Sequence, residues 1–372
     1  MNILALNAGS SSLKFRLFQV TDGTEEVLSE GTAERVSGDT LLPAAQKAID
    51  QCKPLGINAV GHRLVHGGAK FTGPTRITSE TLTELKGLRE LDPLHNPAEI
   101  ALIEATQRLL PNLPTIAVFD TAFHRTLPEV AYTYALPREI SEKHVLRRYG
   151  FHGLSHQYVS GKLLECLGRP ADGTRLITCH LGSGASACAL LNGKSVDTSM
   201  GMTPLEGLVM GTRSGDVDPG LLLYLLREQK MSAEDLDDML NHQSGLQGVS
   251  GLSSDVRDLE KAASEGSAQA ELALALFAYR VRKYIGAYAA ALGGLDAVAF
   301  TGGVGEHSAS MRARICTGLD FFGVRLNADA NQNADGKAAA RLSPEDSPVE
   351  AWVIPTDEER QIAREVTGLL QA

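Results

Sequence analysis

The segment 2–18 holds a turn whose residue types suit an anion. An apolar run ends at Asn7, passes through Gly9 and three serines, and resumes as far as Phe18. This pattern predicts a strand, a tight polar turn and a returning strand. Gly9 lets the backbone approach a ligand closely, the serine hydroxyls donate, and Lys14 adds positive charge, so the turn is suited to cradle a phosphate. An ordinary serine-rich hairpin is the alternative.

A second segment repeats this design. In residues 176–191 the string His180-x-Gly182-Ser183 stands where Asn7-x-Gly9-Ser10 stands in the first. Both segments read as an apolar strand, a hydrogen-bonding side chain, Gly-Ser and a second apolar strand, and internal duplication explains this most economically. Two such cradles facing one another across a cleft between related domains would hold the phosphates of a nucleotide.

Three further side chains have the chemistry to act on an anion. Arg63 lies in the strand-like run 59–65, and Arg213 lies in the glycine-containing loop 210–219. Each can present its planar fork to a ligand, although a solvated or ion-paired surface arginine is the alternative. Asp120 directly follows the short apolar run 115–119, at the strand end where open α/β sheets bind ligands.

Histidines occur twice with HxxxH spacing, at His62 and His66 and again at His152 and His156. In a strand the first two would lie about 13 Å apart, which disfavours a shared metal. Gly153 leaves His152 outside a regular helix. We therefore interpret His152 as a single donor to a charged ligand, with a structural histidine as the alternative.

Two segments near the C-terminus complete the candidates. Residues 302–306 form a glycine turn after the strand-like run 297–301, which is typical of nucleotide binding and also of helix packing. Thr356 is the expected N-cap of a final helix and Glu359 the expected partner in a capping box. Glu358 is then free to bind Mg²⁺, unless these acids only complement the helix dipole.

Composition narrows the classes of partner. The chain has 372 residues, 43% hydrophobic and 22% charged, with a formal net charge of −10. An acidic protein disfavours nucleic acid and anionic membranes as partners, so an anionic substrate requires a local basic site. Five scattered cysteines without a CxxC motif indicate reduced thiols and a cytoplasmic protein. No secretory signal is expected, and Arg280, Arg282 and Lys283 make the helical stretch 266–294 a core helix rather than a membrane span.

Eight strings, in order along nearly the whole chain, resemble the acetate, propionate and butyrate kinases of the actin, sugar-kinase and heat-shock-chaperone superfamily. They are Asn7–Lys14, Gly61–Gly68, Asp92–Pro97, Val118–His124, Arg148–His156, Met202–Arg213, Thr301–Glu306 and Pro355–Glu359. The resemblance implies a duplicated two-domain α/β, ribonuclease H-like fold with a nucleotide cleft between the domains. The expected divisions are 1–149 for the acyl substrate and phosphate, 150–356 for the nucleotide, and a helix 357–372 that packs back on the first domain.

The resemblance also implies roles for single residues. Asn7 and Glu358 would bind Mg²⁺ or Mn²⁺, Arg63 and Arg213 would flank the acetate carboxylate and the phosphoryl group, His152 would stabilise that group, and Asp120 would be the catalytic aspartate. The acyl pocket would consist of Val65, Leu94 and Pro204, with Arg63 binding the carboxylate. The nucleotide, ATP or ADP, would contact Lys14, His180, Leu181, Gly182, Ser183, Gly184, Asp255, Val256, Arg257, Gly303, Val304, Gly305, Glu306 and His307.

The chain departs from the family pattern in two places. Ser183 stands where the family usually has asparagine, so a phosphate contact there would run through water. The segment between Lys14 and His62 is shorter than expected, which bears on the surface of the homodimer that the resemblance implies.

The expected reaction is a reversible, in-line transfer of a phosphoryl group from ATP to acetate, giving acetyl phosphate. The attack joins two anions, so neutralising charge is the main problem. Acetate is already ionised at pH 7. We therefore expect Asp120 to orient Arg213 or a metal-bound water rather than to act as a base. The alternatives are a propionate or butyrate kinase, a non-catalytic nucleotide-binding protein, and a kinase for hydroxyl substrates, which would need a base.

Overall fold

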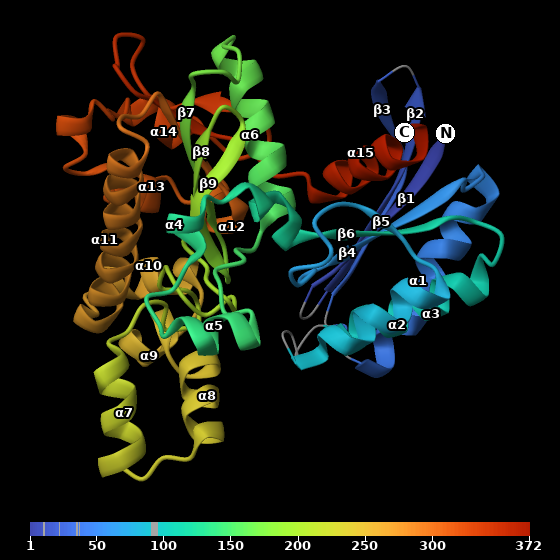
Figure 1. Cartoon of the computed structure of the whole chain (residues 1–372). Coiled ribbons are helices and arrows are strands. Elements are labelled where there is room, and N and C mark those ends of the chain that lie inside the picture. The colour runs from blue at the N-terminus through green and yellow to red at the C-terminus, as the bar shows by residue number, and fades with distance from the viewer. Residues whose placement is uncertain (10–11, 22, 35, 37, 91–95) are drawn as a thin grey trace. The chain divides into compact units, whose positions relative to one another are not determined.

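The computed structural model describes residues 1–9, 12–21, 23–34, 36, 38–90 and 96–372. They form two compact units (Figure 1). The first consists of residues 1–125, 151–158 and 357–372, and the second of residues 126–150 and 159–356. At 150/151, next to the boundary expected after Tyr149, the chain passes from the second unit back to the first. The chain also passes between the units at 125/126, 158/159 and 356/357.

The first unit is built on a six-stranded sheet in the order β3-β2-β1-β4-β6-β5. Its strands are β1 (Asn2–Ala8), β2 (Ser12–Thr21), β3 (Thr24–Glu34), β4 (Ala59–Leu64), β5 (Thr75–Arg76) and β6 (Thr115–Phe119). Strand β1 pairs antiparallel with β2 and parallel with β4, which in turn pairs parallel with β6. The carboxyl ends of β1, β4 and β6 therefore meet at one edge, which is the ligand edge of an open sheet.

Helices cover both faces of this sheet. On one face α1 (Gly38–Cys52) packs against α3 (Asn96–Leu109), and Ala48 and Ile49 of α1 lie in one apolar cluster with Leu4 and Leu6 of β1. On the other face lies α15 (Glu358–Gln371), whose Ile362 contributes to a second cluster (Figure 1). The unit also contains α2 (Ser79–Lys86), the start of α6 (Gly153–Leu167) and the 3₁₀ turns η1 (Lys53–Leu55), η2 (Gly87–Glu90) and η3 (Asp120–Thr126).

The second sheet has the same topology as the first. Its order is β11-β12-β10-β7-β8-β9, and adding six to each strand number of the first sheet reproduces it in reverse. The strands are β7 (Arg175–Leu181), β8 (Ala185–Leu191), β9 (Lys194–Thr198), β10 (Ala297–Thr301), β11 (Ala340–Arg341) and β12 (Glu350–Val353). The pairs β7–β8 and β8–β9 are antiparallel, and β7–β10 and β10–β12 are parallel. The duplication read from the two cradle segments thus extends to both sheets.

The second unit is rich in helices. The long helix α11 (Ala268–Ala291) packs against β7 and β8, and its neighbours include α9, α10 and α13. The other helices of the unit are α4 (Glu129–Tyr132), α5 (Arg138–His144), α7 (Pro219–Glu228), α8 (Ala233–His242), α9 (Gly245–Ser250), α10 (Val256–Ser264), α12 (Gly302–His307), α13 (Ala309–Cys316), η4 (Asp320–Phe322) and α14 (Ala328–Asn333).

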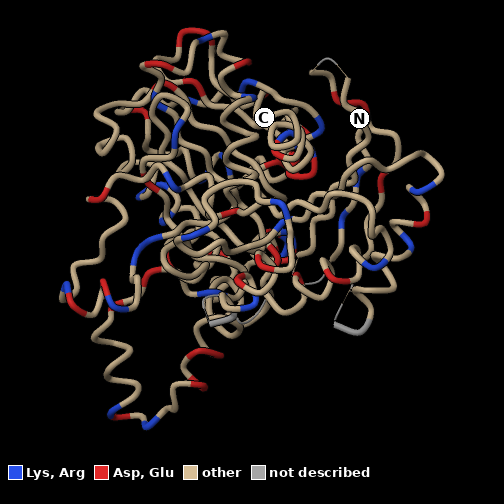
Figure 2. Tube along the Cα trace, turned by 45° about the vertical axis from the view of Figure 1, so that its right-hand side comes forward, with Lys and Arg blue, Asp and Glu red and all other residues tan. Residues whose placement is uncertain are grey.

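Two further properties of the described residues concern membrane-spanning helices and the distribution of charge. Within the described ranges, no helix is both long enough and apolar enough to cross a bilayer. Basic and acidic residues both occur along the traces of the two units (Figure 2).

Candidate functional site

Arg63 and Asp120 form a buried ion pair at the carboxyl edge of the first sheet. Arg63 Nε and Nη2 both donate to Asp120 Oδ2, at 3.1 and 2.6 Å. The remaining nitrogen, Nη1, donates to the carbonyl oxygen of Ala8 at 3.3 Å and to Asn7 Oδ1 at 3.4 Å. One guanidinium therefore joins the ends of β1, β4 and β6.

Negative charge exceeds positive charge around this pair. Burial alone would lower the pKa of Arg63, but the carboxylates of Asp120 and Glu358 raise it above its usual value, so the guanidinium stays charged. Burial raises the pKa of Asp120, Glu358 adds to the rise, and Arg63 opposes it. Arg63 is thus a cation with several acidic neighbours, of which Asp120 binds it directly.

His152 is fixed by contacts of its neighbours with Asp120. Leu154 N donates to Asp120 Oδ1 at 3.4 Å, and a Cβ on Gly153 would lie only 1.8 Å from the carbonyl oxygen of Asp120. His152 itself has a φ of 55°, in the left-handed region that is costly for a residue with a Cβ. Strain held by its surroundings is typical of a functional position. Asp120 was expected to orient Arg213 or a water, and the partners found for it are Arg63 and Leu154.

The start of α15 brings two glutamates to Asn7. Asn7 Nδ2 donates to Glu358 Oε2 at 2.9 Å and to Glu359 Oε1 at 2.8 Å. The expected capping box of Thr356 and Glu359 is wrong, because the N-cap is Asp357, whose Oδ1 accepts from Arg360 N at 3.0 Å. Glu359 cannot close such a box, since its buried side chain faces Asn7.

Two of the three residues expected to contact the acyl group are described. Val65 is buried, and its backbone N–H donates to Glu99 Oε1 and Oε2 at 3.1 and 3.3 Å. Glu99 thereby fixes the backbone of Val65 directly after β4. Leu94 lies outside the described residues. Pro204 belongs to the second unit, where its carbonyl oxygen accepts from Arg213 Nη1 at 3.4 Å.

A cavity of about 600 Å³ lies in the second unit, beside the second cradle. Eight of the residues expected to contact a nucleotide line it: Gly182, Ser183, Asp255, Val256, Arg257, Gly303, Val304 and His307. Ser254, Glu260 and Ser308 also line it and were not predicted. Glu260 follows Arg257 by about one helical turn and Ser308 is the N-cap of α13, so helix periodicity and capping rules were the available signals.

The other expected nucleotide contacts do not line this cavity: His180, Leu181, Gly184, Gly305, Glu306 and Lys14. Lys14 belongs to the first unit, opposite Asn7 in the β1–β2 pairing. Glu306 has a structural contact, because its Oε1 accepts from Gly302 N at 2.8 Å. Gly302 itself has a φ of 75° and lies so close to the Leu181 backbone that a Cβ would come within 2.8 Å of it. Glu306 therefore stabilises the turn that forms one wall of the cavity.

The loop that carries Arg213 is attached to the rim of this cavity. Gly211 N donates to the carbonyl oxygen of Ser183 at 2.9 Å, and Met210 N donates to the carbonyl oxygen of Arg213 at 3.1 Å. The backbone of Arg213 is therefore held close to the second cradle within the second unit.

The chain matches a protein-family model over most of its length. The model of the acetokinase family matches residues 44–364, which include Arg63, Asp120, His152, Arg213 and Glu358. The chain belongs to the acetokinase family. Asn7 and Lys14 precede the matched range, and full-length relatives cover them.

Members of the acetokinase family are similar to this chain over its whole length. An acetate kinase of Dictyoglomus thermophilum is 48% identical, with 100% of this chain and 99% of the relative covered. The crystal structure of Porphyromonas gingivalis acetate kinase has a TM-score of 0.92 at 42% identity, covering 99% of both chains. A propionate kinase from Francisella tularensis has a TM-score of 0.88 at 38% identity, covering 98% of both chains.

The fold reaches beyond the acetokinase family. The ROK hexokinase of Thermus thermophilus shares it, with a TM-score of 0.50 at 13% identity and full coverage of both chains. The two mixed sheets of equal topology are therefore the duplicated α/β fold expected from the sequence.

Proposed function

We propose that this protein transfers a phosphoryl group from ATP to acetate, reversibly, and forms acetyl phosphate. The observation that carries the proposal is the placement of Arg63 at the ligand edge of the first sheet, fixed by Asp120 and adjacent to Asn7. A guanidinium fixed in this way keeps a positive charge at this edge, which suits a carboxylate or a phosphoryl group. Membership of the acetokinase family supports the same reaction.

Charge balance at this edge argues for a divalent cation as a partner of the first unit. The carboxylates of Asp120, Glu358 and Glu99 act on one guanidinium, and burial together with the Glu358 carboxylate raises the pKa of Glu359. Two anions about 4 Å apart repel by about 1 to 4 kcal/mol near a protein surface. A carboxylate substrate entering here therefore needs added positive charge.

The residues fit Mg²⁺, which uses one or two protein oxygens together with water and phosphate oxygens. Asn7 and Glu358 would hold it. Two protein oxygens leave the other coordination positions of Mg²⁺ to water and phosphate. Asn7 now directs its amide nitrogen at Glu358, so ligation requires the amide to turn its oxygen to the metal. Bound Mg²⁺ would supply charge neutralisation to the phosphates.

Asp120 acts in this proposal as a positioning residue for Arg63 and for the His152 segment. Its Oδ2 accepts from Arg63 and its Oδ1 accepts from Leu154 N. Acetate has no proton to lose at pH 7, so the reaction needs no base. These contacts favour a carboxylate acceptor over a hydroxyl acceptor, which would require a free base.

The remaining roles follow from position and charge. ATP or ADP occupies the cavity of the second unit, where Ser183 contacts phosphate through water. Arg213, fixed beside Ser183, and His152 stabilise the transferred group as its charge is redistributed. Lys14 contacts the nucleotide phosphates.

The acyl group contacts Val65, Leu94 and Pro204, which are apolar and discriminate by volume. Propionate is the second candidate substrate, because the propionate kinase of Francisella tularensis is similar over 98% of this chain.

We further propose a cytoplasmic homodimer. Leu221 and Tyr224, three residues apart on α7, are 47% and 52% exposed, and an exposed apolar pair of this kind fits a contact between copies. The five cysteines are all free thiols, which fits a reducing compartment.

The test is incubation of the protein with ATP, Mg²⁺, acetate and hydroxylamine, which traps acyl phosphate as a hydroxamate. We expect hydroxamate with acetate and less with propionate. ADP binding without hydroxamate from any short carboxylate would instead indicate a non-catalytic nucleotide-binding protein.

A further inference from the structure

The first turn of α15 presents three adjacent acids to the first sheet. Asp357, Glu358 and Glu359 follow one another, and like charges so close repel unless each has a partner. Asp357 Oδ2 accepts from Arg360 Nε and from Arg16 Nη1, both at 3.0 Å. Glu358 and Glu359 accept from Asn7.

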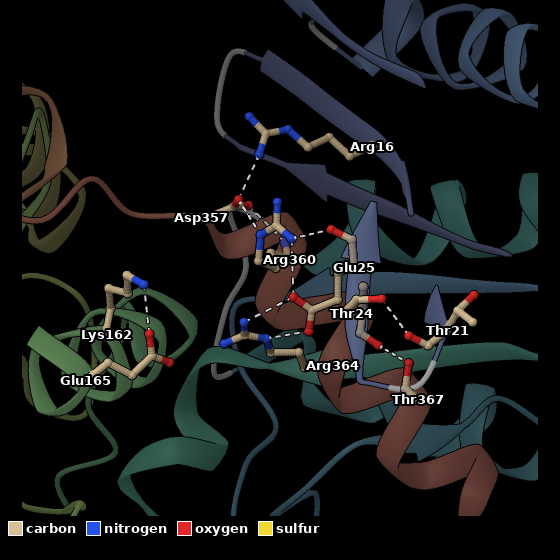
Figure 3. Close-up of polar contacts among 11 residues, drawn as sticks. Arg16, Thr21, Thr24, Glu25, Lys162, Glu165, Asp357, Arg360, Arg364 and Thr367 are labelled. Atoms are coloured by element: carbon tan, nitrogen blue, oxygen red, sulfur yellow. Dashed lines mark hydrogen bonds and ion pairs between the residues drawn. The ribbon is translucent and has the colours of Figure 1, made fainter. Parts of the chain in front are cut away.

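Glu25 of β3 links the same helix turn to the β2–β3 hairpin (Figure 3). Its Oε1 and Oε2 accept from Arg364 Nε and Nη2 at 2.7 and 3.0 Å, and its Oε2 also accepts from Arg360 Nη1 at 3.2 Å. The backbone carbonyl oxygen of Glu25 accepts from Arg360 Nη1 at 2.8 Å. One carboxylate thereby holds two guanidiniums one helical turn apart.

These contacts form a line of alternating charges. From the hairpin to the helix it runs Glu30, Arg16, Asp357, Arg360, Glu25 and Arg364. The Glu25 side chain is only 11% exposed, so solvent screens its pairs less than ordinary surface pairs. Burial opposes the charged form of Glu25, but the hydrogen bonds from Arg364 and Arg360 outweigh this effect and lower its pKa.

We propose that Glu25 is a positioning residue for Glu358: through Arg360 and Asp357 it sets the first turn of α15, so that the Glu358 carboxylate reaches the cation site beside Asn7. This inference rests on the proposed role of Glu358 in holding Mg²⁺. Glu25 acts on Glu358 through a series of contacts. Glu25 fixes Arg360, Arg360 fixes the N-cap Asp357, and Glu358 is the next residue.

The proposed role belongs to Glu25 and not to its neighbour Glu26. Glu26, the next residue along β3, is exposed and has no ion pair among those found in the described chain. Glu26→Gln is therefore a matched control for Glu25→Gln. Both remove one negative charge from the same hairpin, but only Glu25→Gln removes the partner of Arg360 and Arg364.

The test measures Mn²⁺ binding in the presence of saturating ADP, by the electron paramagnetic resonance signal of free Mn²⁺, in the full-length protein. We expect Glu25→Gln to weaken Mn²⁺ binding about tenfold, as outer-shell substitutions at metal sites do. Glu26→Gln should bind as the wild type does. In a Glu358→Gln background, Glu25→Gln should have no further effect on binding, because the two changes act through one contact.

The possible results distinguish a wrong metal assignment for Glu358 from a wrong positioning role for Glu25. Equal Mn²⁺ binding by wild type and Glu358→Gln would overturn the metal assignment and with it the role of Glu25. A loss in Glu358→Gln but none in Glu25→Gln would overturn the positioning role alone. A purely structural role would lower the melting temperature equally in both backgrounds and leave Mn²⁺ binding unchanged.

Discussion

Arg63 binds Asp120 through a single oxygen, Oδ2, at 2.6 Å from Nη2 and 3.1 Å from Nε. The second oxygen, Oδ1, is left for Leu154 N at the start of α6. One buried carboxylate therefore orients both the guanidinium and the segment that carries His152. In the proposed reaction, which has no proton to remove, Asp120 is therefore expected to act by positioning these two groups.

Replacing either arginine by lysine should severely impair activity. Arg63→Lys and Arg213→Lys keep a positive charge, but an ammonium group cannot reproduce a planar fork. Arg63 uses all three nitrogens, to Asp120, to the Ala8 carbonyl oxygen and to Asn7. We expect kcat/KM to fall about 100-fold or more in the hydroxamate assay, as for loss of a donor to developing charge. The control is Arg108→Lys on the exposed side of α3, and activity within threefold of wild type for either test variant contradicts the assignment.

Glu358→Ala should lose activity without losing stability, whereas Asp357→Ala should lose stability and, because Asp357 helps to position Glu358, part of the activity. Asp357→Ala removes the N-cap of α15 and should cost about 0.5–2 kcal/mol in the free energy of unfolding. Glu358→Ala should retain stability and lose most turnover, because it removes the proposed magnesium ligand. Urea unfolding and the hydroxamate assay measure the two effects. Matching stability losses with near-normal activity in both variants would refute the metal role.

His152→Ala should lower kcat more than it raises KM for acetate. A group that meets charge mainly in the transition state contributes little to ground-state binding. Steady-state kinetics with varied acetate provide the measurement. A change confined to KM would place His152 in substrate binding.

Val65→Ala should raise the ratio of kcat/KM for propionate to that for acetate. An extra methylene in an apolar pocket is worth about 1–3 kcal/mol, so wild type should accept propionate at about a tenth to a hundredth of its acetate efficiency. The Val65 backbone stays in place, since Glu99 holds its N–H. An unchanged ratio, or a wild-type preference for butyrate, would mean that other residues form the pocket.

His62 should make the folded protein sensitive to acid. It is buried, neither ring nitrogen has a hydrogen-bond partner among the described residues, and burial lowers its pKa from 6.5 to about 3. Between these two values the unfolded chain binds a proton that the folded protein does not. Stability contributed by neutral His62 is therefore present above about pH 6.5 and is lost as pH falls, by about 1.4 kcal/mol per pH unit.

His62→Leu should flatten this dependence, because leucine fills similar space without titrating. Urea unfolding of wild type and variant at pH 7 and pH 5 measures the difference. Relative to wild type, the free energy of unfolding of His62→Leu should be higher at pH 5 than at pH 7. Parallel losses in both proteins would show that His62 is not the group responsible.

The sequence by itself determined the local elements and the residue types of the site. The strands of both cradles, the strand before Asp120 and the strand, turn and helix at 297–307 form as predicted, because apolar runs and glycine turns are local signals. Ser10 and Ser11 of the first cradle lie outside the described residues. The duplication could also be predicted, because the two cradle segments share one short pattern of residues. Whole-chain motifs were enough to indicate the acetokinase family.

Only the tertiary structure decided which partner each charged side chain has. Thr356 and Glu359 have the spacing of a capping box, yet Asp357 caps α15 because the packing of the helix turns Glu359 inward to Asn7. The Glu99 carboxylate likewise accepts from Val65 N, which lies 34 residues earlier in the chain. Asp120 meets Arg63 because β4 and β6 are neighbours in the sheet. Such pairings join residues far apart in the chain, so the spacing of residues along the sequence does not predict them. Packing and burial determine these pairings.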